Sequence, residues 1–171
     1  MNFTQLITDR YSVRNFSDKA VEDEKLMKIL EAGRLAPTAV NYQPQKIYVL
    51  KSQEALDKVR KATRMAFNAP VVLIVAYDTT VSWKNKREPG YDSGEMDASI
   101  IATHMMLQAQ ELGLGTLWAR GYKTEDIVNA FNIPSHIKPV MLLDLGYPAE
   151  ESKPAHLHYE RKDLKDTVTF L

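Results

Sequence analysis

The chain has 171 residues, 44% of them hydrophobic and 26% charged, which is the composition of an ordinary globular protein and the length of one domain, here expected over residues 1–171. Its 22 basic residues balance 22 acidic ones, which argues against nucleic-acid binding, and no apolar run is long enough for a membrane helix. It contains no cysteine, which excludes disulfides, thiolate catalysis and cysteine-based metal sites, and without an evident signal peptide we expect a cytoplasmic location.

In the first half of the chain, helical spacing of apolar residues alternates with short β-rich runs. The run 71–77 is continuously apolar, as expected for a strand that is buried on both faces. Pro37 should end the helix expected over 21–35, because proline lacks a backbone donor and restricts the preceding residue. We therefore expect helices over 2–9, 21–35 and 52–67, an extended segment over 10–16, and strands over 46–50 and 71–77.

The second half begins with a long polar stretch, 78–93, which we expect to be irregular and, from its length, to carry function. The following helix, 94–113, is apolar on nearly all sides, so it should lie in the core or between subunits. Further strands are expected over 115–120 and 139–147, a short helix over 124–131, and a mostly irregular tail over 148–171. The fold class is α+β, with one mixed, mostly antiparallel sheet flanked by helices.

Arg10, Ser12 and Arg14 are alternate residues of an extended segment, so their side chains should lie on one side of the chain. Two guanidinium groups and a hydroxyl on one face suit a phosphate or another anion, because arginine presents a bidentate fork of donors. The alternative is a solvated edge strand with surface ion pairs. The spacing alone does not decide between them.

Asn41 and Gln43 lie between Pro37 and Pro44 in the stretch APTAVNYQPQ, which connects a helix to a strand. Amides held by prolines can read the donor and acceptor edge of a flat heterocycle. The alternative is a turn that the amides merely stabilise.

Other familiar sites are not indicated. The four histidines are scattered, which does not favour a metal site, and there is no Gly-x-Ser-x-Gly elbow. Gly113 and Gly115 follow a helix rather than precede one, so Gly113 is better explained as a helix C-cap than as part of a dinucleotide loop.

Together, five stretches resemble the FMN-dependent nitroreductase family in its small single-domain form. They occur in the family's order: RYSVRNF at 10–16, APTAVNYQPQ at 36–45, LGLGTLW at 112–118, LGYP at 145–148 and RKDL at 161–164. The resemblance implies FMN at the interface of an intertwined homodimer, with the helix 94–112 buried between the subunits.

The resemblance also implies roles for individual residues. Arg10, Ser12 and Arg14 of one subunit, with Arg161 and Lys162, would hold the ribityl phosphate and the pyrimidine edge of the flavin, with Arg14 as the cation near N1. Tyr11 stands in this segment where the family has a second arginine. Pro37, Thr38 and Asn41 would come from the partner subunit, with Gln43 supporting the turn. The segment Ala119–Arg120–Gly121 would direct a backbone N–H at flavin N5.

The implied activity is transfer of electrons from NAD(P)H through FMN to a flat acceptor such as a nitroaromatic or a quinone, by a ping-pong cycle. The flavin would carry the chemistry, so no catalytic side chain and no metal is expected. Alternatives are a specialised member such as an oxidase or dehalogenase, with 78–93 as its lid, and a flavin-binding sensor or store without turnover. Arg120 could point into the site, favouring an acidic acceptor or the phosphate of NADPH, or out to solvent.

Overall fold

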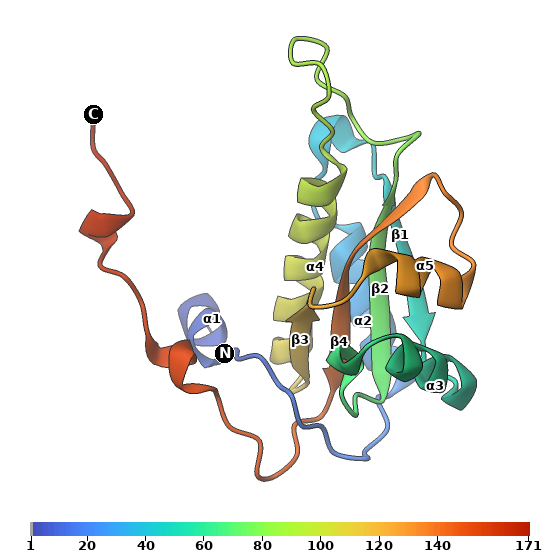
Figure 1. Cartoon of the computed structure of the whole chain (residues 1–171). Helices are drawn as coiled ribbons and strands as arrows, with labels where there is room; N and C mark the ends of the chain where they lie inside the picture. Colours follow the sequence, from blue (N-terminus) through green and yellow to red (C-terminus); the bar gives the residue numbers. More distant parts are fainter. Residues whose placement is uncertain (1) are drawn as a thin grey trace.

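The computed structural model describes residues 2–171 and is built around a four-stranded sheet (Figure 1). The strands are β1 (Gln45–Leu50), β2 (Val71–Asp78), β3 (Gly115–Ala119) and β4 (Ile137–Gly146), in the spatial order β1-β2-β4-β3. All three strand pairs are antiparallel, and one isolated parallel bridge joins Ser12 to Thr116 at the β3 edge. The expected mixed, mostly antiparallel sheet is confirmed.

Helices cover both faces of this sheet. On one face lie α2 (Asp23–Arg34) and α4 (Gly94–Glu111), whose buried residues pack with Leu73, Val75 and Leu143. On the other face lie α3 (Gln53–Ala62) and α5 (Thr124–Phe131), which cover Val72, Ile74 and Leu142. Successive strand residues point to opposite faces, which is why β2 has to be apolar at nearly every position.

The helix α4 approaches β2 closely at its first residue. A Cβ built on Gly94 would lie 2.0 Å from Cδ2 of Tyr77, so only glycine fits there. At the other end, Gly113 has φ +77° and the Leu114 N–H donates to the Ala109 carbonyl, which closes the helix as a Schellman motif. The expectation that Gly113 is a helix C-cap residue is confirmed.

One expectation about local structure was wrong. The helix expected over 52–67 ends at Ala62, because Thr63 is extended and its side chain accepts from the Met65 N–H to start a separate turn, Arg64–Ala66. The stretch 78–93 has no helix or strand after Asp78, as expected, but it is ordered. It forms a loop shaped like a hairpin, here called the hairpin, in which one isolated bridge pairs Lys84 with Asp92 and the Asn85 N–H donates to the Tyr91 carbonyl.

The two ends of the chain lie beside the sheet rather than in it (Figure 1). The N-terminal helix α1 (Phe3–Asp9) contributes no buried residue. From Pro148 the tail leaves the body and contains only short 3₁₀ turns, His156–Tyr159 and Leu164–Asp166, with the large apolar side chains Leu157, Leu164 and Phe170 exposed. Within residues 2–171, no helix combines the length and apolarity needed to cross a bilayer.

Candidate functional site

The segment 10–16, here called the arginine-rich segment, runs along the open edge of β3. The Val13 N–H donates to the Thr116 carbonyl at 2.9 Å, and the Val13 side chain is fully buried. Arg10 and Ser12 are half-buried and Arg14 is exposed, with its Nη1 donating to the Ser12 carbonyl at 3.3 Å. The sheet edge therefore fixes the backbone between Arg10 and Arg14 and leaves the polar side chains free to meet a ligand.

Arg10 lies close to Arg161 of the C-terminal tail. Burial, and after it the positive charge of Arg161, lowers the pKa of the Arg10 guanidinium. Arg161 is oriented by its own backbone, since Nη1 donates to the carbonyls of His158 and Glu160 at 2.6 Å each. Within residues 2–171 neither guanidinium lies within ion-pair distance of a carboxylate. Two adjacent cations without a counter-charge favour binding of an anion.

Tyr11 joins the arginine-rich segment to the tail. Its hydroxyl donates to Ser152 Oγ at 3.2 Å, and its ring meets His158 edge-on with centroids 6.4 Å apart. A cavity of about 690 Å³ lies here, lined by α1, Tyr11 and the tail through Arg161. Lys162 follows Arg161 and is exposed. The structure thus brings Arg10 and Tyr11 together with Arg161, which is far from them in the sequence.

The connection between α2 and β1, residues 36–44 and here called the turn, has an unusual backbone. Val40, Asn41 and Gln43 have φ values of 54°, 56° and 51°, in the left-handed region, although none is glycine. This conformation is a true outlier for a β-branched residue such as Val40 and costs of order 1–2 kcal/mol per residue. Thr38 holds the turn, since its Oγ1 accepts from the Gln43 N–H at 3.0 Å and its carbonyl accepts from the Asn41 N–H. Strain of this kind is frequent at ligand sites.

Pro37, Asn41 and Gln43 are exposed and Thr38 is half-buried. The Gln43 amide donates to the Asn41 carbonyl at 3.3 Å, so it supports the turn from within. The buried Pro44 carbonyl accepts from the Asp78 N–H, which fastens the turn to the end of β2. The polar atoms of the turn therefore face outward on a fixed backbone.

Asp97 is a site-supporting residue that sequence reasoning missed. It is 2% exposed in the first turns of α4, and its Oδ1 accepts from the Ala39 N–H at 2.8 Å. Its Oδ2 accepts from Ser93 Oγ at 2.7 Å. One buried carboxylate thus ties the strained turn to the base of the hairpin 78–93. An acidic residue among the apolar positions of α4 was the available signal, but its partner Ala39 lies 58 residues away in sequence.

The segment Ala119–Gly121 lies at the far end of β3 from the Ser12 bridge. Ala119 is buried, whereas Arg120 and Gly121 are exposed. Arg120 donates to the Tyr122 carbonyl and to Thr124 Oγ1, and its guanidinium lies 5.0 Å from the Tyr122 ring centroid. Within one chain, Arg120 is therefore turned toward the start of α5.

The strand register separates the turn from the arginine-rich segment. Ser12, Thr116, Leu145 and Val71 form one row across the sheet, whereas the turn enters β1 at Gln45, which pairs with Tyr77. Val71 and Tyr77 are six residues apart on β2 (77 − 71), or roughly 20 Å at ~3.3 Å per residue. The two groups also lie beside opposite edge strands, about 14 Å apart at ~4.8 Å per strand spacing. One chain does not bring its two predicted groups together.

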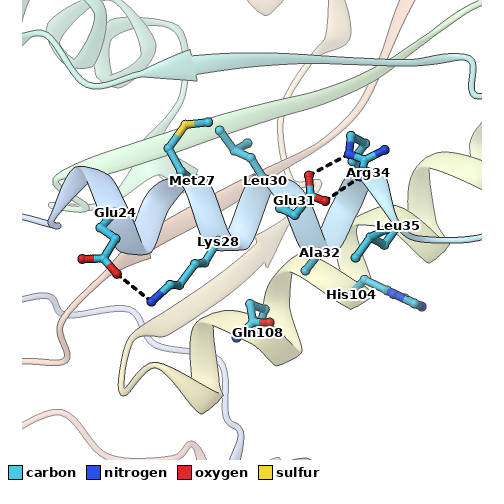
Figure 2. Close-up of a pocket in the computed structure, with 10 residues that line it drawn as sticks. All are labelled: Glu24, Met27, Lys28, Leu30, Glu31, Ala32, Arg34, Leu35, His104 and Gln108. Carbon is cyan, nitrogen blue, oxygen red and sulfur yellow. Dashed lines mark hydrogen bonds and ion pairs between the residues drawn. The ribbon is translucent and has the colours of Figure 1, made fainter.

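A different cavity, of about 760 Å³, lies in the groove between α2 and α4 (Figure 2). Met27, Leu30 and Leu35 give it an apolar wall, with His104 and Gln108 on the α4 side and the pairs Glu24–Lys28 and Glu31–Arg34 along its rim. None of the predicted cofactor-binding residues lines it. Across residues 2–171, no cluster of three metal-ligating side chains occurs.

Known proteins resemble this chain in both sequence and fold. The family model described as "Nitroreductase family" matches residues 7–67 and 60–147. The chain belongs to the nitroreductase family. A Methanothermobacter thermautotrophicus protein described as an NADH dehydrogenase/NAD(P)H nitroreductase is 33% identical over 94% of this chain and 88% of its own length.

Other members extend the comparison. A Bacillus subtilis protein described as FMN reductase [NAD(P)H] is 27% identical over 94% of this chain and 72% of its own. The crystal structure of a nitroreductase family protein from Clostridium difficile superposes with a TM-score of 0.92, at 36% identity, over 99% of this chain and 98% of that one. The nitroreductase fold expected from the sequence is confirmed.

Proposed function

We propose that this chain is an NAD(P)H-dependent FMN oxidoreductase that reduces flat acceptors such as nitroaromatics or quinones. The observation that carries the proposal is the adjacency of Arg10 and Arg161, two guanidinium groups without a carboxylate partner in the described residues. The FMN phosphate is the anion that this pair would hold. Relatives described as NAD(P)H nitroreductase and FMN reductase support the choice of cofactor and donor.

Four other predicted residues would act on the same cofactor. Arg14, which is exposed beside Ser12, would place a cation at the pyrimidine edge, where reduced flavin carries negative charge. Asn41 and Thr38 would present their polar groups to the ring, with Gln43 bracing the turn. When bound, FMN supplies the redox chemistry, taking two electrons from NAD(P)H and delivering two to the acceptor. The protein orients both partners and excludes water.

The proposed site is built from two copies of the chain. The turn and the arginine-rich segment lie roughly 20 Å apart along the strands and beside opposite edges of the sheet, so in this proposal they contact one flavin from different subunits. Apolar surface for such a homodimer is available at the exposed Met96 and Ile100 of α4, in the groove of Figure 2 and at the exposed apolar side chains of the tail. The single-domain organisation of each chain stays a prediction.

The first test is an absorption spectrum of the purified protein, followed by anaerobic titration with NADH and then NADPH. A flavin spectrum that bleaches with either nucleotide is expected. A bound flavin that neither nucleotide reduces would favour the sensor or store, and a protein that cannot take up FMN would refute the proposal.

The shared site is tested by subunit complementation. Arg10→Ala and Asn41→Ala chains, each expected to bind FMN weakly as homodimers, are co-expressed with different tags and the mixed dimer is isolated. One of its two sites then carries both changes and the other carries neither, so about half of the wild-type FMN content should return. Unrestored FMN binding in a confirmed mixed dimer would place the whole site within one chain.

A further inference from the structure

The hairpin 78–93 projects past the end of the sheet, beside the turn that precedes β1 (Figure 1). Its base is held at three points: Asp78 N–H to the Pro44 carbonyl, Ser93 N–H to the Trp83 carbonyl, and the Lys84–Asp92 ion pair. Trp83 and Tyr91 pack edge to face with centroids 5.9 Å apart. The hairpin is therefore a fixed structure next to the turn proposed for the flavin.

A cavity of about 640 Å³ lies between this hairpin and the turn. Its walls include the rings of Tyr42 and Trp83 together with the three cations of the hairpin, Lys84, Lys86 and Arg87. Tyr42 is 50% exposed and stands between Asn41 and Gln43, so a ligand in this cavity would adjoin the proposed flavin wall. Two aromatic rings beside basic side chains suit a flat ligand that carries an acidic group.

The charges in the cavity are not internally balanced. Lys84 is paired with Asp92, but Lys86 and Arg87 have no carboxylate within ion-pair distance among residues 2–171. Glu88, the other acidic residue near the tip, does not line the cavity. The side chain that could have neutralised these cations therefore lies outside, and their charge stays available to a ligand.

We infer that this cavity, defined by Tyr42, Trp83, Lys86 and Arg87, receives an anionic group of the ligand that exchanges electrons with the flavin. This inference rests on the proposed function. The anion has two possible sources with the same chemistry: an acidic group on the acceptor, or the additional phosphate that distinguishes NADPH from NADH. Arg120, which is turned toward α5, does not perform this role within one chain.

The test compares wild type with Lys86→Ala/Arg87→Ala, and with Lys58→Ala/Lys61→Ala, which removes two charges from the exposed side of α3. The oxidative half-reaction is measured with 4-nitrobenzoate and the uncharged 4-nitrobenzyl alcohol, and the reductive half-reaction with NADPH and NADH. For the anionic member of one pair, we expect the second-order rate constant of Lys86→Ala/Arg87→Ala to fall about fivefold to tenfold. The rate constant for the neutral or less charged member of that pair should not change. The α3 variant should match wild type.

The pair that responds identifies the source of the anion. The loss should shrink as ionic strength rises from 0.01 to 0.15 M, because exposed charges are screened over about 8 Å at the higher value. Equal rates for both members of both pairs in the hairpin variant would overturn the inference, as would equal losses in the hairpin and α3 variants.

A binding measurement separates failure of this inference from failure of the proposed function. The chain has two tryptophans, so a Trp118→Phe form reports on Trp83 alone. Quenching of its fluorescence by 4-nitrobenzoate should saturate and should weaken about fivefold to tenfold on adding Lys86→Ala/Arg87→Ala. The cavity assignment is overturned if Lys86→Ala/Arg87→Ala changes neither the quenching by 4-nitrobenzoate nor the rates with NADPH and NADH. This holds even if flavin reduction is normal.

Discussion

Asp144 makes stability depend on pH in a direction opposite to that of carboxylates that gain an ion pair or hydrogen bonds on folding. It lies in β4 with no exposed surface, and its register partners are Val72 and Leu117. Neither carboxyl oxygen has a hydrogen-bond partner in the described residues. Burial raises the pKa of Asp144 to about 8, and the opposing charge of Arg60 offsets only part of this, because Arg60 donates to the carbonyls of Phe67 and Ala69.

The sign follows from proton linkage. The pKa of Asp144 in the folded chain lies above the ordinary aspartate value of 3.8. Between pH 4 and 8 the folded chain therefore keeps a proton on this carboxyl group, whereas the unfolded chain has already lost it. The free energy of unfolding should therefore fall by about 1.4 kcal/mol per pH unit across that window and become flat above pH 8. The loss between pH 5 and 8 is on the order of 4 kcal/mol, or roughly 10 °C in Tm for a chain of this size.

The assay is urea unfolding of wild type and Asp144→Asn at half-unit steps from pH 5 to 9. An amide cannot ionise, so the stability of the variant relative to wild type should rise through pH 5 to 8 and then level off. Other groups titrate equally in both proteins and cancel in the difference. The control is Asp18→Asn, an exposed position with the same change in charge, whose difference from wild type should not vary across this range.

A difference between Asp144→Asn and wild type that stays constant from pH 5 to 8 would refute this reasoning. It would mean that Asp144 ionises readily in the folded chain, which requires Arg60 to leave the two carbonyls and pair with it.

Three further changes test the site and the packing. Arg10→Ala removes a charge-assisted contact to the proposed phosphate and should weaken FMN binding by tenfold to a hundredfold in an equilibrium titration, whereas Lys19→Ala should not; unchanged affinity would remove Arg10 from the site. Asp97→Ala leaves the Ala39 N–H and Ser93 hydroxyl unpaired and should lower the free energy of unfolding by about 2–4 kcal/mol, with Asp97→Asn recovering part of both stability and FMN affinity; equal behaviour of the alanine and asparagine forms would contradict the role given to these hydrogen bonds. Gly94→Ala places a methyl group against the Tyr77 ring and should cost about 1–3 kcal/mol in urea unfolding, more than Gly90→Ala in the open hairpin tip gives through strain alone; a smaller loss than at Gly90 would show that α4 shifts freely from β2.

Local patterns in the sequence were sufficient to predict those features that depend on neighbouring residues alone. The apolar run 71–77 predicts a doubly covered strand because side chains alternate between faces, and the structure places helices on both. Pro37 and Gly113 mark helix ends through restrictions on their own backbone. The prediction that Arg10, Ser12 and Arg14 hold an anion stays a prediction, although Arg161 now lies beside Arg10.

Only the tertiary structure decided which distant residues meet. The order β1-β2-β4-β3 depends on the pairing of β2 with β4, whose partners are 59 to 74 residues apart (137 − 78 and 145 − 71), and no local propensity encodes that choice. It buries Asp144 without a hydrogen-bond partner among residues 2–171, brings Ala39 to Asp97, and sets Tyr42 in one cavity with Lys86 and Arg87. The sequence by itself determined most of the elements, the family and the choice of candidate residues. The packing of those elements determined the charge state, the strain and the cavities, because each depends on what surrounds a residue in space rather than along the chain.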